Sequence, residues 1–170
     1  NNLEDYVKKI DEFKPQLIDG YPSAIFIIAD FILKKGIKIK NHPIAISCTA
    51  ETLFDFQRKV IEEAFSCKVY NQYASSEGIP FICECIMGSL HIFPESGVFQ
   101  FREVSKNNNE IIAELIATSF RSFKTPLIRY KTGDYVKLLT GQNKCRCGSI
   151  FPTVSQIFGR EDDILFTKEK

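Results

Sequence analysis

Apolar side chains in the first part of the chain alternate between helical spacing and short unbroken runs. Residues 3–13 carry an apolar side chain every three or four positions, which predicts a helix with one buried face. We expect Ser23 to cap a helix that Gly36 ends, and Thr49 to cap a helix over residues 51–65. Three apolar runs predict strands between these helices, at residues 16–19, 43–48 and 67–70. This alternation predicts a parallel sheet with crossover helices.

The pattern changes from residue 80 onward. Apolar or alternating stretches now follow one another with only turns between them, at residues 80–87, 89–94, 97–104, 110–119, 127–130 and 135–139. Such a series predicts antiparallel strands in a curled, barrel-like sheet. The predicted fold class is therefore α/β, with a parallel βαβ part over residues 1–79 and an antiparallel β-rich part over residues 80–158.

Composition and charge narrow the class of protein. The chain has 170 residues, of which 22 are basic and 21 acidic, so its net charge of +1 provides no strongly basic surface for nucleic acid or anionic lipid. The apolar runs are too short to span a membrane, and the first residues lack the features of a signal peptide. These features predict a cytoplasmic protein with reduced cysteines. Because the sequence does not begin with Met, we expect it to be a piece of a larger protein.

Four short stretches contain residues suited to chemistry. Residues 70–78 follow a strand and combine hydroxyls with Glu77, which suits phosphate oxygens and Mg²⁺, although a solvated turn has the same composition. Asp134 could accept hydrogen bonds from paired sugar hydroxyls or lie in a hairpin turn. Residues 159–163 form a charged turn or a hydrophilic loop, and residues 47–51 lie at a strand–helix junction that is also a helix cap.

The order and spacing of these stretches resemble the adenylate-forming superfamily. Its four elements correspond here to Thr49-Ala50-Glu51, Tyr73-Ala74-Ser75-Ser76-Glu77, Tyr130-Lys131-Thr132-Gly133-Asp134 and Gly159-Arg160-Glu161-Asp162-Asp163. Within the superfamily the chain is most similar to phenylacetate-CoA ligases, coenzyme-F-adenylylating synthetases and capsule-biosynthesis proteins. The Thr-Pro-Leu-Ile-Arg-Tyr phrase of residues 125–130 and a Cys-x-Cys-Gly turn indicate that branch. The resemblance covers essentially the whole chain, but only a middle portion of a full-length member.

The resemblance implies a role for each matching residue. Thr49, Ala50 and Glu51 would border the adenine pocket, Tyr73 would stack on adenine beside Ala74, and Ser76 would lie near the phosphates. Glu77 would bind Mg²⁺, Asp134 the ribose hydroxyls and Arg160 the ribose or phosphate. Asp162 would be the hinge of the carboxy-terminal domain, which would begin within residues 159–170. Ala74 departs from the usual Gly of the family and is small enough to keep the backbone near the nucleotide.

The implied activity of an intact relative is ATP-dependent activation of a small carboxylate as acyl-AMP, usually followed by thioester formation with CoA. The glycine-rich phosphate loop and the catalytic lysine of the family have no counterpart in these 170 residues. We therefore expect the chain alone to bind AMP or ATP weakly and to be inactive. The competing hypothesis is a non-catalytic, zinc-stabilised binding module, a degenerate relative of the enzymes. The carboxylate and the oligomeric state are left open.

A metal site is the second candidate. Cys145 and Cys147 form a close thiolate pair on a turn, and two more ligands would complete a tetrahedral zinc site. Cys85 and His91 can face one another across a hairpin, while Cys83 competes with Cys85 because alternation places both on one face. In the alternative, Cys85 is a core residue and His91 lies on the surface. Several members of the phenylacetate-CoA ligase branch carry a structural zinc at such a place.

Overall fold

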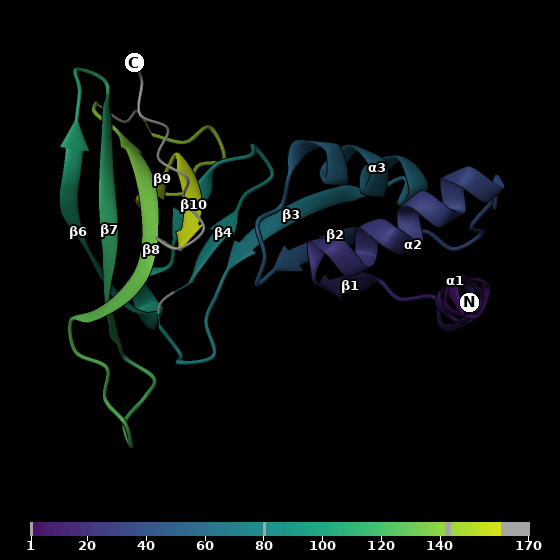
Figure 1. The fold of residues 1–170 in the computed structure, drawn as a ribbon, viewed down its shortest axis with the longest axis horizontal. Coiled ribbons are helices and arrows are strands. Elements are labelled where there is room, and N and C mark those ends of the chain that lie inside the picture. The colour runs from purple at the N-terminus through teal and green to yellow at the C-terminus, as the bar shows by residue number, and fades with distance from the viewer. Residues whose placement is uncertain (1, 80, 142–143, 161–170) are drawn as a thin grey trace, which may run out of the picture. The chain divides into compact units, whose positions relative to one another are not determined.

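Helices and parallel strands precede a wholly antiparallel part in the fold (Figure 1). The structure is a computed structural model that describes residues 2–79, 81–141 and 144–160. It divides the chain into two units, Asn1–Gln72 and Tyr73–Lys170. The predicted α/β fold class is confirmed. Within the described ranges, no helix combines the length and apolarity that a membrane crossing requires.

The first unit alternates helices with parallel strands. Its elements are α1 (Leu3–Phe13), β1 (Leu17–Gly20), α2 (Pro22–Lys35), β2 (Ala45–Thr49), α3 (Asp55–Phe65) and β3 (Lys68–Tyr73), whose last residue already belongs to the second unit. In register, Leu17 of β1 lies opposite Ala45 of β2, which in turn lies opposite Lys68 of β3. Helices α2 and α3 connect these strands and pack against each other.

The core of the first unit follows from the two periods of its sequence. Ile25, Ala29 and Ile32 are buried because they share one face of α2. Ile46 and Cys48 alternate along β2 and are fully buried on the same side of the strand. These side chains belong to one apolar cluster, so the sheet and its crossover helices share a core.

Both predicted caps in this unit are wrong. Helix α2 begins at Pro22, after Tyr21, so Ser23 lies inside its first turn, whereas Gly36 ends the helix in a left-handed conformation as predicted. Helix α3 begins at Asp55 and not near residue 51. The reason is the backbone of Ala50, whose φ of 65° turns the chain away from a helix directly after β2.

The second unit consists of antiparallel strands. Its elements are β4 (Ile82–Glu84), β5 (Leu90–Ile92), the short helix η1 (Pro94–Ser96), β6 (Gly97–Lys106), β7 (Glu110–Ser119), β8 (Tyr130–Leu139), β9 (Thr153–Val154) and β10 (Gln156–Arg160). Strands β6, β7 and β8 run side by side (Figure 1), and β10 pairs with the other edge of β8. Strand β5 pairs with β4 and β9. One core unites both groups of strands, from Ile82, Ile92 and Val154 to Ala113, Leu115 and Val136.

Strand β8 differs most from the sequence prediction. The strand expected at residues 127–130 is not formed over 127–129, and the one expected at 135–139 begins earlier, as Tyr130–Leu139; the hairpin-turn alternative for Asp134 is therefore wrong. The strand continues past Gly133 because β7 pairs with β8 on either side of it, through Lys131 and Tyr135. A register shift between Glu114 and Ile116 accommodates the irregularity in β7. Asp134 thereby acquires a fixed place in a sheet.

Candidate functional site

Asp134 and Tyr73 form a short hydrogen bond within the second unit. The Tyr73 hydroxyl, at the end of β3, donates to Asp134 Oδ2 at 2.5 Å, and both side chains are half-buried. Burial, together with the Asp134 carboxylate, raises the pKa of the Tyr73 hydroxyl, so this group remains a donor at neutral pH. The structure thus links two residues that the sequence resemblance treats as separate contacts of a nucleoside.

The backbone of Asp134 is fixed from the side of β7. Its N–H donates to Thr132 Oγ1 at 3.0 Å, and the Thr132 hydroxyl donates to the carbonyl of Leu115 at 3.2 Å. Gly133 between them has a φ of 77°, which a side chain would strain. Thr132, which the sequence analysis assigned no role, is therefore what anchors the carboxylate-bearing strand.

Glu77 lies on an exposed loop that other side chains hold in place. Ser75 Oγ donates to Glu77 Oε2 at 2.6 Å. This hydrogen bond, with a smaller effect from the Arg160 charge, holds the pKa of the Glu77 carboxyl below its ordinary value. Glu77 is consequently an anion at neutral pH, with oxygen atoms suited to Mg²⁺. The loop also contains Ser76, which is exposed, and Ala74, which is half-buried.

Two further serines hold the Glu77 loop and were missed by the sequence analysis. Ser122 Oγ donates to the Glu77 carbonyl at 3.0 Å, and Ser119 Oγ donates to the Gly78 carbonyl at 2.5 Å. Both serines lie more than forty residues farther along the chain, so no local pattern pointed to them. They join the Glu77 loop to the end of β7 and to the segment that follows it.

Arg160 faces the same part of the second unit. It lies directly opposite Asp134 in the pairing of β10 with β8, and its charge acts on Glu77. The structure therefore brings Tyr73, Glu77, Asp134 and Arg160 into one neighbourhood. Asp162, the predicted hinge, lies outside the described residues, as do Glu161 and Asp163.

The remaining predicted nucleotide residues belong to the first unit. Thr49 ends β2, opposite Gln72 of β3, and the next two residues turn the chain toward α3. Glu51 accepts two hydrogen bonds from Ser23, at 3.1 Å from the backbone N–H and at 3.0 Å from Oγ. The carboxylate thus binds the first turn of α2, where the helix dipole favours an anion. Ser23 thus donates hydrogen bonds to Glu51 and does not act as the helix cap predicted from the sequence.

We expect the Ala50→Gly variant to be more stable than the wild type by about 0.5–1 kcal/mol, because Ala50 occupies a left-handed conformation that glycine adopts without strain. The measurement is the free energy of unfolding from urea denaturation. Ala45→Gly is the matched control: Ala45 lies in extended β2, where glycine should destabilise by a similar amount. Equal losses of stability in both variants would contradict the assigned strain at Ala50.

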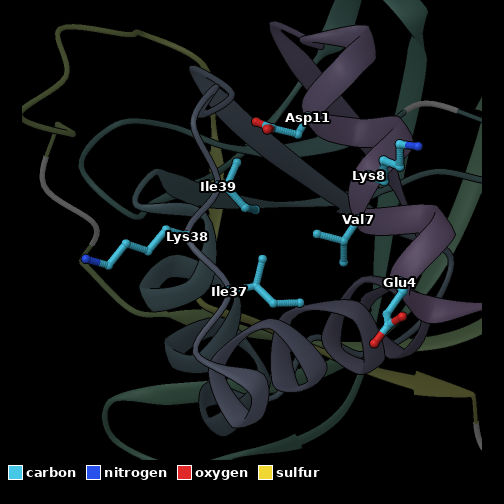
Figure 2. Close-up of a pocket in the computed structure, with 7 residues that line it drawn as sticks. All are labelled: Glu4, Val7, Lys8, Asp11, Ile37, Lys38 and Ile39. Carbon is cyan, nitrogen blue, oxygen red and sulfur yellow. The ribbon is translucent and has the colours of Figure 1, made fainter.

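A separate cavity of about 220 Å³ lies between α1 and residues 37–39 (Figure 2). Figure 2 shows Val7, Ile37 and Ile39 pointing toward one another, with Lys38 directed away. Asp11 accepts hydrogen bonds from the N–H groups of Lys40 and Asn41, both at 2.9 Å. The Asp11 carboxylate thus holds the segment after α2 in place. We therefore interpret the cavity as a gap in the packing between α1 and this segment.

The second cluster of chemical interest contains Cys85, His91, Cys145 and Cys147, whose ligand atoms all lie within 4.8 Å of one another. Cys85 Sγ is 3.8 Å from Cys145 Sγ, and Cys147 Sγ is 3.4 Å from His91 Nε2. Zinc–sulfur bonds of about 2.3 Å at tetrahedral angles place two sulfurs about 3.8 Å apart. The four donors therefore fit a tetrahedral Zn²⁺ ion.

Two similar turns present the cysteines. Gly88 N–H donates to the Cys85 carbonyl at 2.8 Å, and Gly148 N–H donates to the Cys145 carbonyl at 3.1 Å. Both glycines have positive φ values, 79° and 85°. Cys83 lies opposite His91 in the pairing of β4 with β5 and is not part of the group of four. Cys85 therefore belongs to the group of four because the turn at the end of β4 presents it, and not because of alternation along the strand.

Hydrogen bonds orient His91 and ionise Cys145, whereas burial and the neighbouring cysteines raise the pKa of the Cys147 thiol. His91 is buried, and its Nδ1 lies 3.1 Å from the Phe151 carbonyl, which leaves Nε2 directed at the sulfurs. The Ser89 hydroxyl, the N–H of Cys147 and His91 lower the pKa of the Cys145 thiol to about 6. A thiolate is the form that binds metal. The donor set of three sulfurs and one imidazole suits Zn²⁺ rather than Mg²⁺ or Ca²⁺.

Curated proteins resemble the chain over nearly its full length, whereas no family model matches it. It is 44% identical to Protein CapK of Staphylococcus aureus, over 99% of this chain and 36% of that protein. It is 30% identical to phenylacetate-coenzyme A ligase of Thermus thermophilus, over 97% of this chain and 38% of that protein. The chain thus spans little more than a third of the length of these relatives.

Solved structures share the fold. A 2-hydroxyisobutyryl-CoA ligase in the postadenylation state matches with a TM-score of 0.79 at 19% identity, over 98% of this chain and 37% of that chain. The anthranilate CoA ligase AuaEII, in complex with anthranoyl-AMP, matches with a TM-score of 0.67 at 13% identity, over 96% of this chain and 33% of that chain. In sequence the chain belongs to the family of CapK and the phenylacetate-CoA ligases, to about a third of whose length it corresponds, and solved CoA ligases share its fold.

Proposed function

We propose that the chain is the nucleoside-binding part of an ATP-dependent, AMP-forming ligase that activates a small carboxylate as acyl-AMP. The observation that carries this proposal is the grouping of Tyr73, Glu77, Asp134 and Arg160 within the second unit. These residues provide an aromatic face, two carboxylates and a cation, which are the groups that a nucleotide needs. Relatives with ligase activity in their names support the proposal, and they do not favour the alternative of a non-catalytic zinc module.

In the proposed reaction, a carboxylate oxygen of the substrate attacks the α-phosphorus of ATP, a P–O bond forms and pyrophosphate leaves. Asp134 accepts hydrogen bonds from the ribose hydroxyls, Tyr73 stacks on adenine beside Ala74, and Arg160 faces the ribose or phosphate. The exposed oxygens of Glu77 would hold Mg²⁺, which offsets negative charge on the phosphates, and Ser76 would lie near the phosphates. Thr49, Ala50 and Glu51 would border the adenine pocket.

The assignments outside this group are also proposals. The names of the phenylacetate-coenzyme A ligase relatives suggest that the acyl group passes from AMP to CoA in a second step. Asp162 would be the hinge for the domain that follows residues 1–79 and 80–158 of the adenylation domain. Cytoplasmic localisation stays a prediction.

We further propose that Cys85, His91, Cys145 and Cys147 bind a structural Zn²⁺ ion. All four positions of a tetrahedral site are filled by protein atoms, so no position is left for a reacting water. The ion would tie the β4–β5 turn to the segment before β9, two places about sixty residues apart in sequence. Its role is to stabilise the second unit.

The activity is tested on the full-length protein that contains this chain. We expect ATP, Mg²⁺ and a panel of small carboxylates to yield pyrophosphate and AMP, with one carboxylate class clearly preferred. The 170-residue chain alone should bind AMP no more tightly than about 1 mM by calorimetry, equivalent to about −4 kcal/mol. Formation of ADP and phosphate in place of AMP and pyrophosphate would contradict the proposed function.

A further inference from the structure

The Tyr73–Asp134 hydrogen bond has a consequence for sugar recognition. An aspartate side chain rotates broadly about its terminal torsion, so a carboxylate held only through its backbone samples many orientations. In this structure one oxygen, Oδ2, is held by the Tyr73 hydroxyl at 2.5 Å. A carboxylate has acceptor sites on both oxygens, so a held carboxylate can still receive hydrogen bonds from a ligand.

Both partners of this hydrogen bond are themselves fixed. The backbone of Asp134 is anchored through Thr132 to β7, as described above. The Tyr73 ring packs against Phe99 of β6, with ring centroids 6.4 Å apart. The hydroxyl stays protonated at neutral pH because burial and the nearby carboxylate raise its pKa. The Asp134 carboxylate is therefore oriented before any ligand binds.

We propose that Tyr73 is a positioning residue for ribose, whose hydroxyl holds the Asp134 carboxylate in the orientation that accepts both ribose hydroxyls. This inference rests on the proposed function, in which Asp134 binds ribose. It assigns Tyr73 a second role besides contact between its ring and adenine. Preorganisation of this kind strengthens binding by removing the freedom that the ligand would otherwise have to restrict.

The test separates the hydroxyl of Tyr73 from its ring. Tyr73→Phe in the full-length protein keeps the ring and removes only the donor. We expect its affinity for AMP to fall about 5- to 10-fold, while its affinity for 2′,3′-dideoxy-AMP stays within about 2-fold of wild type. Calorimetry with the two nucleotides gives the ratio of their affinities, which measures the preference for AMP over the dideoxy nucleotide. Tyr70→Phe removes a hydroxyl from the same strand, β3, and should leave the ratio unchanged.

Substitutions of matched size guard against a folding defect in Tyr73→Phe. At position 73, p-methylphenylalanine fills the volume of the hydroxyl without a donor, whereas p-aminophenylalanine restores a donor. The first should lower the preference for AMP and the second should recover it. An unchanged preference with p-methylphenylalanine, or an equal loss of affinity for both nucleotides in Tyr73→Phe, would overturn the inference.

The Asp134→Ala variant distinguishes a failure of this inference from a failure of the proposed function. If the wild type prefers AMP and Asp134→Ala loses the preference while Tyr73→Phe keeps it, only the positioning role is wrong. If the wild type itself shows no preference for AMP over the dideoxy nucleotide, the proposed ribose contact is wrong. Adding Tyr73→Phe to Asp134→Ala should cause no further loss of preference, because the hydroxyl then has no carboxylate to hold.

Discussion

Replacing Asp134 with alanine in the full-length protein should lower kcat/KM for ATP by roughly 10- to 150-fold. This range corresponds to the loss of about 1.5–3 kcal/mol, typical of hydrogen bonds to a charged group. The variant removes the carboxylate that faces Arg160 and Tyr73, while the strand around position 134 keeps its partners in β7 and β10. The measurement is the initial rate of pyrophosphate release at several ATP concentrations.

Asp30→Ala is the matched control for this experiment. Asp30 forms a surface ion pair with Lys34 in α2, at 2.7 Å, and has no part in the candidate site. A pair of this kind contributes little to stability, so the control should retain kcat/KM within about 2-fold. If Asp134→Ala behaved like this control, the assignment of Asp134 to ribose would fail.

Removing a ligand of the Cys/His cluster should abolish zinc binding and unfold the second unit at a much lower temperature. We expect about one zinc ion per wild-type chain and almost none in Cys85→Ser or Cys145→Ser. A cross-link that closes a loop of this length stabilises a chain by about 4 kcal/mol in the entropic model. The thermal midpoint should therefore fall by at least about 10 °C. Elemental analysis and thermal melts provide the measurements.

Cys83→Ser is the control, because Cys83 lies in β4, two residues before Cys85, and outside the group of four ligand residues. This variant should keep its zinc. If Cys85→Ser kept its zinc and Cys83→Ser lost it, the metal site would stand, with Cys83 in place of Cys85 as a ligand. Wild-type protein with less than about a tenth of an equivalent of zinc, and a melt unaffected by chelation, would reject the site.

The choice between Cys83 and Cys85 shows how a local signal can be overlooked. Alternation along a strand places both side chains on one face, so this pattern could not separate them. However, Cys85 is followed three residues later by Gly88, just as Cys145 is followed by Gly148. Both glycines adopt positive φ in equivalent turns. The repeated Cys-x-x-Gly spacing was available in the sequence and favoured Cys85.

The candidate nucleotide site combines residues that the sequence identified with contacts that it could not. Tyr73 and Asp134 were selected from motifs, yet the hydrogen bond between them joins positions 61 residues apart. Ser119 and Ser122 carry no motif at all, and their contacts with the Glu77 loop depend on how β7 ends. A motif identifies residue types, whereas the partners of each residue depend on the register of distant strands.

By itself, the sequence determined the division into a parallel and an antiparallel part, the extent of α1 and the end of α2 at Gly36. These features depend on side-chain periods and on backbone preferences within a few residues. Only the tertiary structure decided where α3 begins, that β8 is one strand through Gly133, and that Ser23 binds Glu51. For β8 and for Ser23, distant segments supply hydrogen bonds that the local segment lacks, whereas α3 begins late because Ala50 adopts a left-handed backbone directly after β2.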